Sequence, residues 1–152
     1  MPKKEIISRS LADTRKIARD FLEEILKRNN RQTRAIVVAL YGNLGAGKTS
    51  FTQQAGKILG VSGRKINSPT FVIMKRYVLE GKKGLKNLFH LDAYRLKSGK
   101  ELIRLGWEEI ISDPAHIVFI EWPENVSKAI PRPHHKVRIS HTQEGHRRFK
   151  ML

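Results

Sequence analysis

The chain contains no cysteine and no apolar run long enough to cross a bilayer. The lack of cysteine excludes a disulfide framework and thiolate metal sites, and it is compatible with a reducing cytoplasm. A membrane-spanning helix needs about 20 apolar residues in succession, and the amino-terminal segment lacks the apolar centre of a signal peptide. We therefore expect a soluble, cytoplasmic protein without membrane contact.

Acidic residues are also scarce. The 14 Asp and Glu stand against 30 Lys and Arg, which gives a net charge of +16. Such an excess favours polyanionic partners such as RNA through phosphate contacts and counterion release. The basic residues are spread along the whole chain without an Arg/Gly or aromatic-interleaved motif. Two interpretations stay open: proximity to RNA through a basic surface, or a lysine-rich composition that only solvates the outer faces.

One segment carries the strongest functional signal. Residues 42–49, Gly-Asn-Leu-Gly-Ala-Gly-Lys-Thr, match the P-loop (Walker A) pattern and follow the apolar run at 35–41. A P-loop needs a buried strand before it and a helix that starts at its lysine, and residues 50–59 suit that helix. An ordinary glycine-rich turn with a surface lysine is the weaker alternative, because motif, strand and helix agree. The residues predicted to contact the nucleotide are Gly42, Asn43, Leu44, Gly45, Ala46, Gly47, Lys48, Thr49 and Ser50.

The chemistry within this loop follows from the residue types. Lys48 is predicted to reach the β- and γ-phosphates, and the hydroxyl of Thr49 is predicted to bind Mg²⁺. The positive end of the following helix would stabilise the phosphates. The motif by itself therefore predicts a bound nucleotide.

The rest of the chain alternates between helical and strand patterns, which predicts one globular domain over residues 1–152. We expect an α/β, three-layer P-loop NTPase fold with a mixed, mostly parallel central sheet. The first predicted element is a helix over 11–26, capped by Ser10 or Asp13 and ended by Asn29–Asn30, and an antiparallel hairpin of strands 71–79 and 85–91 follows the P-loop helix. A further helix is opened by a capping box at Ser98–Glu101 and reaches Leu105, and a helical turn follows at 107–111. The remaining elements are a strand at 116–120 and two final strands at 135–139 and 147–152, joined by a turn at Gly145.

Two carboxylates stand where strands are predicted to end. Asp92 follows the strand at 88–91, and Glu121 follows the strand at 117–120. Ligands of α/β folds bind at the carboxyl edge of the sheet, where such acids could hold Mg²⁺ and orient an attacking water. Thr70, in Ser68-Pro69-Thr70-Phe71, belongs either to a plain β-turn or to a switch loop that senses the γ-phosphate. The alternative for each acid is a surface residue that only ends its strand.

Four motifs in one order extend this interpretation. The segments Gly42–Phe51, Asn67–Phe71, His90–Leu96 and Ile120–Glu124 together closely resemble the TsaE (YjeE) family, the small ATPases of bacterial tRNA threonylcarbamoyladenosine biosynthesis. The resemblance runs from about residue 14 to about residue 140. It implies ATP and Mg²⁺ as cofactors and an ATPase that assists a separate threonylcarbamoyl-transferase complex, rather than one that transfers the group itself.

The resemblance also implies roles for single residues. Lys48 and Thr49 would bind phosphate and Mg²⁺, and Thr70 would lie in a switch-like loop. Asp92 and Glu121 would form the functional acidic pair, with Glu121 as the Mg²⁺ partner. The implied partners are two paralogous sugar-kinase-like subunits (TsaB and TsaD type), one of which carries the transferase site, with tRNA near the basic surface. Since no arginine finger is recognisable in the chain, hydrolysis is expected to be slow alone and faster with the partners.

Departures from the family pattern leave other functions open. Asn43 replaces a frequent aspartate, and the final strands match the family poorly, so they are assigned no nucleotide contacts. A small P-loop metabolite kinase is one alternative, with the basic residues of 92–104 (Arg95, Lys97, Lys100 and Arg104) as a conceivable lid. A nucleotide-gated RNA-binding module is another. The six histidines lack the spacing of a metal site.

Overall fold

The computed structural model describes residues 4–28, 33–61, 66, 73–80 and 82–152. The predictions for Asn29, Asn30 and Thr70 lie outside these residues. The elements, in chain order, are β1 (Lys4–Ser8), α1 (Leu11–Arg28), β2 (Ile36–Tyr41), α2 (Lys48–Ile58), β3 (Met74–Val78), the 3₁₀ turn η1 (Lys82–Gly84), β4 (Asn87–Asp92), α3 (Lys100–Ile103), α4 (Trp107–Ser112), β5 (His116–Glu121), η2 (Pro123–Ala129), β6 (His135–His141) and β7 (Arg147–Met151).

All seven strands form one mixed sheet in the order β1-β7-β6-β2-β5-β4-β3. The central strands β6, β2, β5 and β4 pair in parallel, whereas β3 and the β7–β1 side are antiparallel. The predicted mixed sheet, the antiparallel hairpin β3–β4 and the final pair β6–β7 are therefore confirmed. Strand β1 was not predicted, because its short and charged sequence becomes a strand only by pairing along β7.

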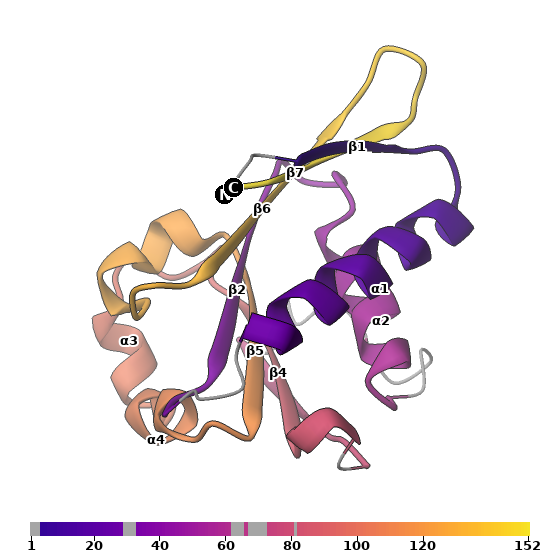
Figure 1. Ribbon diagram of the computed structural model, residues 1–152. Helices are drawn as coiled ribbons and strands as arrows, with labels where there is room; N and C mark the ends of the chain where they lie inside the picture. Colours follow the sequence, from indigo (N-terminus) through magenta and orange to yellow (C-terminus); the bar gives the residue numbers. More distant parts are fainter. Residues whose placement is uncertain (1–3, 29–32, 62–65, 67–72, 81) are drawn as a thin grey trace.

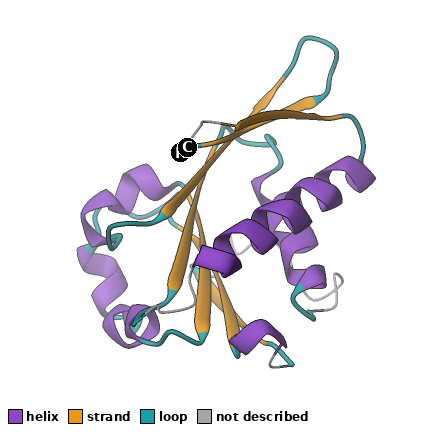
Figure 2. Ribbon diagram, in the orientation of Figure 1, coloured by secondary structure: helices purple, strands orange, loops and turns teal. Residues whose placement is uncertain are grey.

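Helices cover both faces of the sheet, which confirms the predicted three layers (Figures 1 and 2). Helices α1 and α2 lie side by side on one face, where Phe21, Leu22 and Phe51 pack against the sheet. Helices α3 and α4 lie on the other face, and Leu102 and Trp107 fill a second apolar cluster there. Strands β2 and β5 are buried on both sides, so their residues form continuous apolar runs. None of the helices in the described ranges has the length and apolarity that crossing a bilayer requires.

The helix starts show one correct and one wrong prediction. Ser10 caps α1, because its Oγ accepts a hydrogen bond from the Asp13 amide at 3.1 Å, while the Asp13 carboxylate accepts one from the Arg9 amide at 2.9 Å. The capping box at Ser98–Glu101 was wrong. The Glu101 carboxylate accepts from the Lys97 amide instead, at 3.2 Å, and the short helix α3 ends at Ile103 rather than Leu105.

Candidate nucleotide-binding site

The P-loop connects the buried end of β2 to the first turn of α2. Gly42 is required by close packing, since a Cβ there would lie only 2.5 Å from the carbonyl oxygen of Ile139 in β6. Gly47 stands at the N-cap of α2 with φ of 115°, a conformation that favours glycine, and no side chain caps the helix there. The first amides of α2 are therefore arranged as in an anion site.

Lys48, the first residue of α2, is almost fully buried at 4% exposure. Its ammonium donates a hydrogen bond to the carbonyl oxygen of Gly42 at 2.5 Å and lies 3.8 Å from the centroid of the Trp122 ring. Burial lowers the pKa of Lys48, while the nearby carboxylates of Glu121, Glu124 and Asp92 oppose that shift. A phosphate at the loop would add the negative charge that favours the protonated lysine.

The structure brings the two predicted acids together at the carboxyl edge of the sheet. Asp92 ends β4 and Glu121 ends β5, and the two are direct neighbours in the parallel register. Both are largely buried, at 8% and 4% exposure. Thr49 Oγ1 donates to Glu121 Oε2 at 3.1 Å, whereas the Tyr94 amide donates to Asp92 Oδ1 at 2.9 Å. The predicted acidic pair thus stands beside the first turn of α2.

These residues fit Mg²⁺ rather than a metal held by the protein alone. The described residues contain no group of three or more His, Asp or Glu that could hold an ion. Mg²⁺, however, keeps several waters and commonly takes only one or two carboxylates, with phosphate oxygens completing its shell. The hydroxyl of Thr49 and the carboxylate of Glu121 are such oxygen donors, and they already lie within hydrogen-bond distance of one another.

His90 is a site residue whose role was not predicted. It is completely buried in β4, two residues before Asp92, and its Nε2 lies 2.5 Å from Glu121 Oε2. Its Nδ1 has no hydrogen-bond partner among the described residues. From the sequence, His90 was considered only as a metal ligand. Side chains alternate between the two faces of a strand, so His90 and Asp92 lie on the same face of β4. This spacing was the sequence signal that could have placed His90 beside the acidic pair.

A cleft of about 380 Å³ opens over residues 44–50 of the P-loop and α2, with Asp92, Tyr94, Glu121 and Trp122 on its walls. Trp122 adopts the left-handed conformation at φ of 57°, and its ring lies 5.1 Å from that of Tyr94. Gly42 and Asn43, also predicted to contact the nucleotide, line a separate recess on the other side of the loop. None of the basic residues considered for a kinase lid is among the described residues that line the cleft.

The last strand also reaches this cleft, although the final strands were assigned no nucleotide contacts. The guanidinium of Arg147 in β7 lies over Gly47, so close that a Cβ on Gly47 would clash with it. In the described part of the chain, Arg147 makes no ion pair with an acidic residue. Beyond Arg147 and Ser50 lies a smaller recess of about 230 Å³ between the turn at 8–11 and residues 145–146.

Comparisons with known proteins identify relatives over most of the chain. A family model described as threonylcarbamoyl adenosine biosynthesis protein TsaE matches residues 8–149. A tRNA threonylcarbamoyladenosine biosynthesis protein TsaE from Rickettsia felis is 33% identical over 135 residues, which are 89% of this chain and 71% of that protein. The protein of the same description from Rickettsia conorii is 35% identical over 80% of this chain. This chain covers 62% of that protein, which is less than two thirds of its length.

Two further matches come from Bacillus subtilis. The TsaE protein of that organism is 33% identical over 73% of this chain and 65% of its own length. The crystal structure of Bacillus subtilis YdiB superposes with a TM-score of 0.71 at 23% identity and covers 99% of this chain and 84% of that one. The second match shows the shared fold.

Proposed function

The chain belongs to the TsaE family of threonylcarbamoyl adenosine biosynthesis proteins, and on this basis we propose that it binds ATP with Mg²⁺ and hydrolyses it slowly, as an accessory subunit for threonylcarbamoyl modification of tRNA adenosine. The observation that carries this proposal is the hydrogen bond between Thr49 and Glu121 beside the buried Lys48. It joins the first turn of a P-loop helix to an acidic strand end, the arrangement in which P-loop NTPases hold a nucleotide and its metal.

In this proposal the phosphates lie along the amides of residues 44–50. Lys48 exchanges its hydrogen bond to the Gly42 carbonyl for the β- and γ-phosphate oxygens. Ser50 and Arg147 face the α-phosphate, because they border both the cleft and the smaller recess, which takes the nucleoside. The predicted contacts therefore extend to the final strand.

Thr49 and Glu121 would hold the Mg²⁺, which would neutralise phosphate charge and orient the phosphates. Asp92, on the adjacent strand end, orients the attacking water. His90 keeps the Glu121 carboxylate turned toward Thr49. Trp122 and Tyr94 form an aromatic wall that limits access of water to the phosphates. The predicted switch role of Thr70 completes the proposed site.

The proposed partners are a transferase complex of two sugar-kinase-like subunits, of the TsaB and TsaD type, in the cytoplasm. The support is the family resemblance together with the arrangement of the cleft. The catalytic groups of the cleft suit phosphate hydrolysis. The arginine in the cleft, Arg147, lies over the P-loop backbone at Gly47. Slow hydrolysis by the isolated chain and stimulation by the partners follow from the family resemblance and from the lack of a recognisable arginine finger in the sequence.

The test is tRNA modification reconstituted from the partner subunits with and without this chain, followed over many turnovers. Stimulation that starts only after the first turnover, together with ATP hydrolysis that rises when the partners are added, is the expected result. Robust hydrolysis by the isolated chain, or phosphate transfer to a small acceptor, would contradict the proposal and favour the kinase alternative.

A further inference from the structure

One face of the sheet is strongly basic and lies on the side of β6, β7 and β1 that points away from the core. We call it the basic sheet face, and it consists of Lys136, Arg138, Arg148 and Lys150 with one acid, Glu5. Arg138 stands directly opposite Lys150 across the β6–β7 pair, and Glu5 stands opposite Lys150 across the β1–β7 pair. The intervening residues Val137, Ile139 and Phe149 point into the core on the other side.

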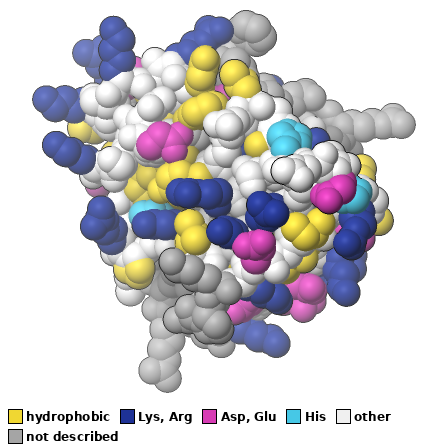
Figure 3. Space-filling model, turned by 90° about the horizontal axis from the view of Figure 1, so that it is seen from above, with side chains coloured by type: hydrophobic (Ala, Val, Ile, Leu, Met, Phe, Trp, Pro, Cys, Tyr) yellow, Lys and Arg dark blue, Asp and Glu magenta, His cyan; other side chains and the backbone are white. Residues whose placement is uncertain are grey.

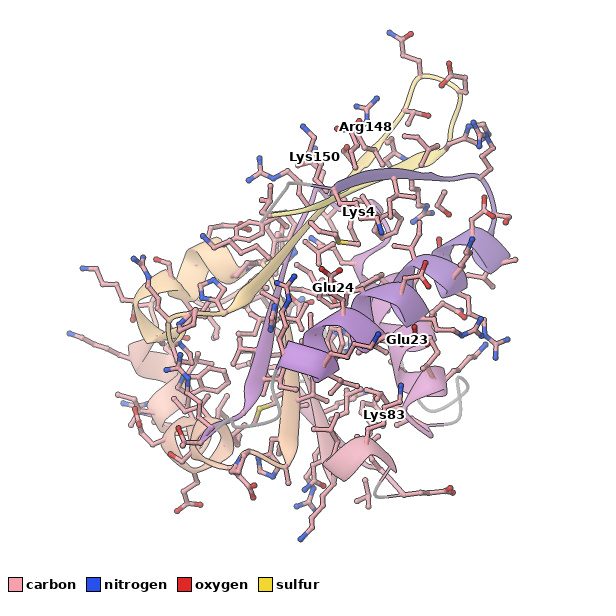
Figure 4. All side chains as sticks on the ribbon, viewed as in Figure 1. Lys4, Glu23, Glu24, Lys83, Arg148 and Lys150 are labelled. Carbon is pink, nitrogen blue, oxygen red and sulfur yellow. The ribbon has the colours of Figure 1, made fainter. Side chains whose placement is uncertain are left out.

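No helix of the described chain lies over the outer side of β7 and β1, and Arg148 and Lys150 extend from β7 away from α1 (Figures 1 and 4). Lys and Arg side chains gather on the face seen from above in Figure 3. The basic sheet face is therefore open to a partner.

The charges on this face are only partly compensated. Glu5 pairs with Arg148 at 3.0 Å and with Lys150 at 3.6 Å. Lys136 and Arg138 are exposed and make no ion pair with any described residue. Like charges directly opposite each other in an antiparallel pair destabilise a sheet, and the Glu5 carboxylate offsets the repulsion between Arg138 and Lys150 only from the Lys150 side.

A recess adjoins this face at the outer edge of the P-loop. It measures about 510 Å³, and its lining includes Tyr41, Asn43, Arg138 and His141 together with one acid, Glu124. The Arg138 guanidinium carbon lies 5.6 Å from the centroid of the Tyr41 ring. An aromatic ring beside an arginine, next to a row of cations, is the combination by which proteins stack a base and hold the backbone of single-stranded nucleic acid.

We propose that the basic sheet face and this recess bind a single-stranded segment of RNA, with phosphates on Lys136, Arg138 and Lys150 and one base against Tyr41. The proposal rests on the proposed function, which brings the chain close to tRNA. Alternate residues along a strand are about 6.6 Å apart, which suits successive phosphates of an extended RNA strand. An acidic protein segment would meet the same charges only where its Asp or Glu residues fall in register, whereas single-stranded RNA presents a phosphate and a base at every step.

Such binding would place RNA and ATP on opposite sides of one loop. Gly42 and Asn43 line only the RNA recess, residues 44, 45 and 47–50 line only the ATP cleft, and Ala46 and Trp122 border both. The two ligands would therefore contact the same P-loop from its two sides.

The experiment measures fluorescence anisotropy of a 3′-fluorescein-labelled tRNA transcript with the full chain at 50–300 mM KCl. The test variant is Lys136→Glu/Arg138→Glu, and the matched control is Arg15→Glu/Arg19→Glu, which makes the same charge change on the exposed side of α1. We expect the test variant to bind tRNA at least tenfold more weakly at 100 mM KCl, and its plot of log K against log salt to flatten by about 1.4, since each lost contact with a single strand removes about 0.7. The control should change affinity by less than threefold.

Three results would overturn the proposal: no tRNA binding by the wild type at 50 mM KCl, equal weakening in both variants, or unchanged tRNA binding with loss of binding to the partner subunits. The last would identify a protein interface instead. Binding of a fluorescent ADP analogue is measured alongside. It should be equal in wild type and test variant, and its absence in the wild type would contradict the proposed ATPase function separately from the RNA site.

Discussion

The imidazole Nε2 of His90 lies 2.5 Å from Oε2 of Glu121, and both side chains are almost fully buried. A proton on Nε2 makes this contact a hydrogen bond from His90 to the carboxylate, whereas Nδ1 of His90 has no partner among the described residues. Glu121 then accepts one hydrogen bond from His90 and another from Thr49. The carboxylate is held in a single orientation at the proposed metal position.

Replacing His90 should impair turnover more than nucleotide binding. In His90→Leu the carboxylate of Glu121 loses one of its two donors, and we expect kcat to fall about 10- to 100-fold, as found when groups that orient metal ligands are removed. In His90→Gln an amide N–H can occupy the position of Nε2 and should restore much of the rate. The measurement is partner-stimulated ATP hydrolysis as a function of Mg²⁺ concentration.

The Mg²⁺ titration distinguishes positioning from mere folding. His90→Leu should need more Mg²⁺ for half-maximal rate while binding the ADP analogue without Mg²⁺ as well as the wild type does. If both His90 variants lose the same activity and keep the wild-type Mg²⁺ dependence, His90 serves only to fill the core.

Lys48 and Glu121 should separate binding from chemistry. Lys48→Ala removes the ammonium that reaches the phosphates, so ATP binding should be abolished. Glu121→Ala leaves the P-loop amides intact and should spare much of the binding while turnover is lost. Titration with a fluorescent ATP analogue and single-turnover hydrolysis check the two properties. The control is Glu109→Ala, which removes an exposed acid of α4 that does not line the cleft, and it should keep both properties. Equal loss of both properties in Lys48→Ala and Glu121→Ala would refute the division of roles.

The sequence predicted the parts of this site that depend on local pattern. The P-loop, its flanking strand and helix, and the acids at the ends of β4 and β5 follow from glycine spacing and from runs of apolar residues, and the structure has each of them. Asp92 and Glu121 could be predicted to meet because parallel strands end at one edge of a sheet.

Contacts between distant segments could not be predicted. Arg147 reaches Gly47 only because β7 pairs with β6 and β6 with β2, a strand order that no local pattern contains. Strand β1 depends on the same pairing. The capping box was wrongly predicted because the amide of Lys97 is near enough to donate a hydrogen bond to the carboxylate of Glu101. Short-range propensity does not decide which of two neighbouring amides is used.

Two glycines of the P-loop should respond differently to alanine. A Cβ at Gly42 would lie 2.5 Å from the Ile139 carbonyl oxygen, a backbone atom, whereas nothing lies within 4 Å of a Cβ at Gly45. Gly45→Ala should cost about 1–2 kcal/mol of stability, the penalty for its left-handed conformation. Gly42→Ala should cost more and should also weaken ADP binding at least tenfold, because β6 or the loop must move. Urea denaturation and ADP titration compare the two variants. If Gly42→Ala and Gly45→Ala lose the same stability and the same ADP affinity, the packing argument is contradicted.

His135 should make the protein less stable at mildly acidic pH. Burial lowers the pKa of His135 below its ordinary value of 6.5, and the nearby Arg28 and His134 lower it further, while Glu24 opposes the shift. The unfolded chain therefore binds more protons than the folded one below about pH 6.5, so the free energy of unfolding falls as the pH drops through that value and levels off below the folded-state pKa. His135→Phe preserves the edge contact with Phe21 and removes the titration, so urea denaturation should show a smaller loss of stability between pH 7.5 and pH 5.5. Burial also lowers the pKa of His134, so His134 should account for part of the remaining loss of stability. Parallel pH profiles of His135→Phe and the wild type would show that His135 does not contribute.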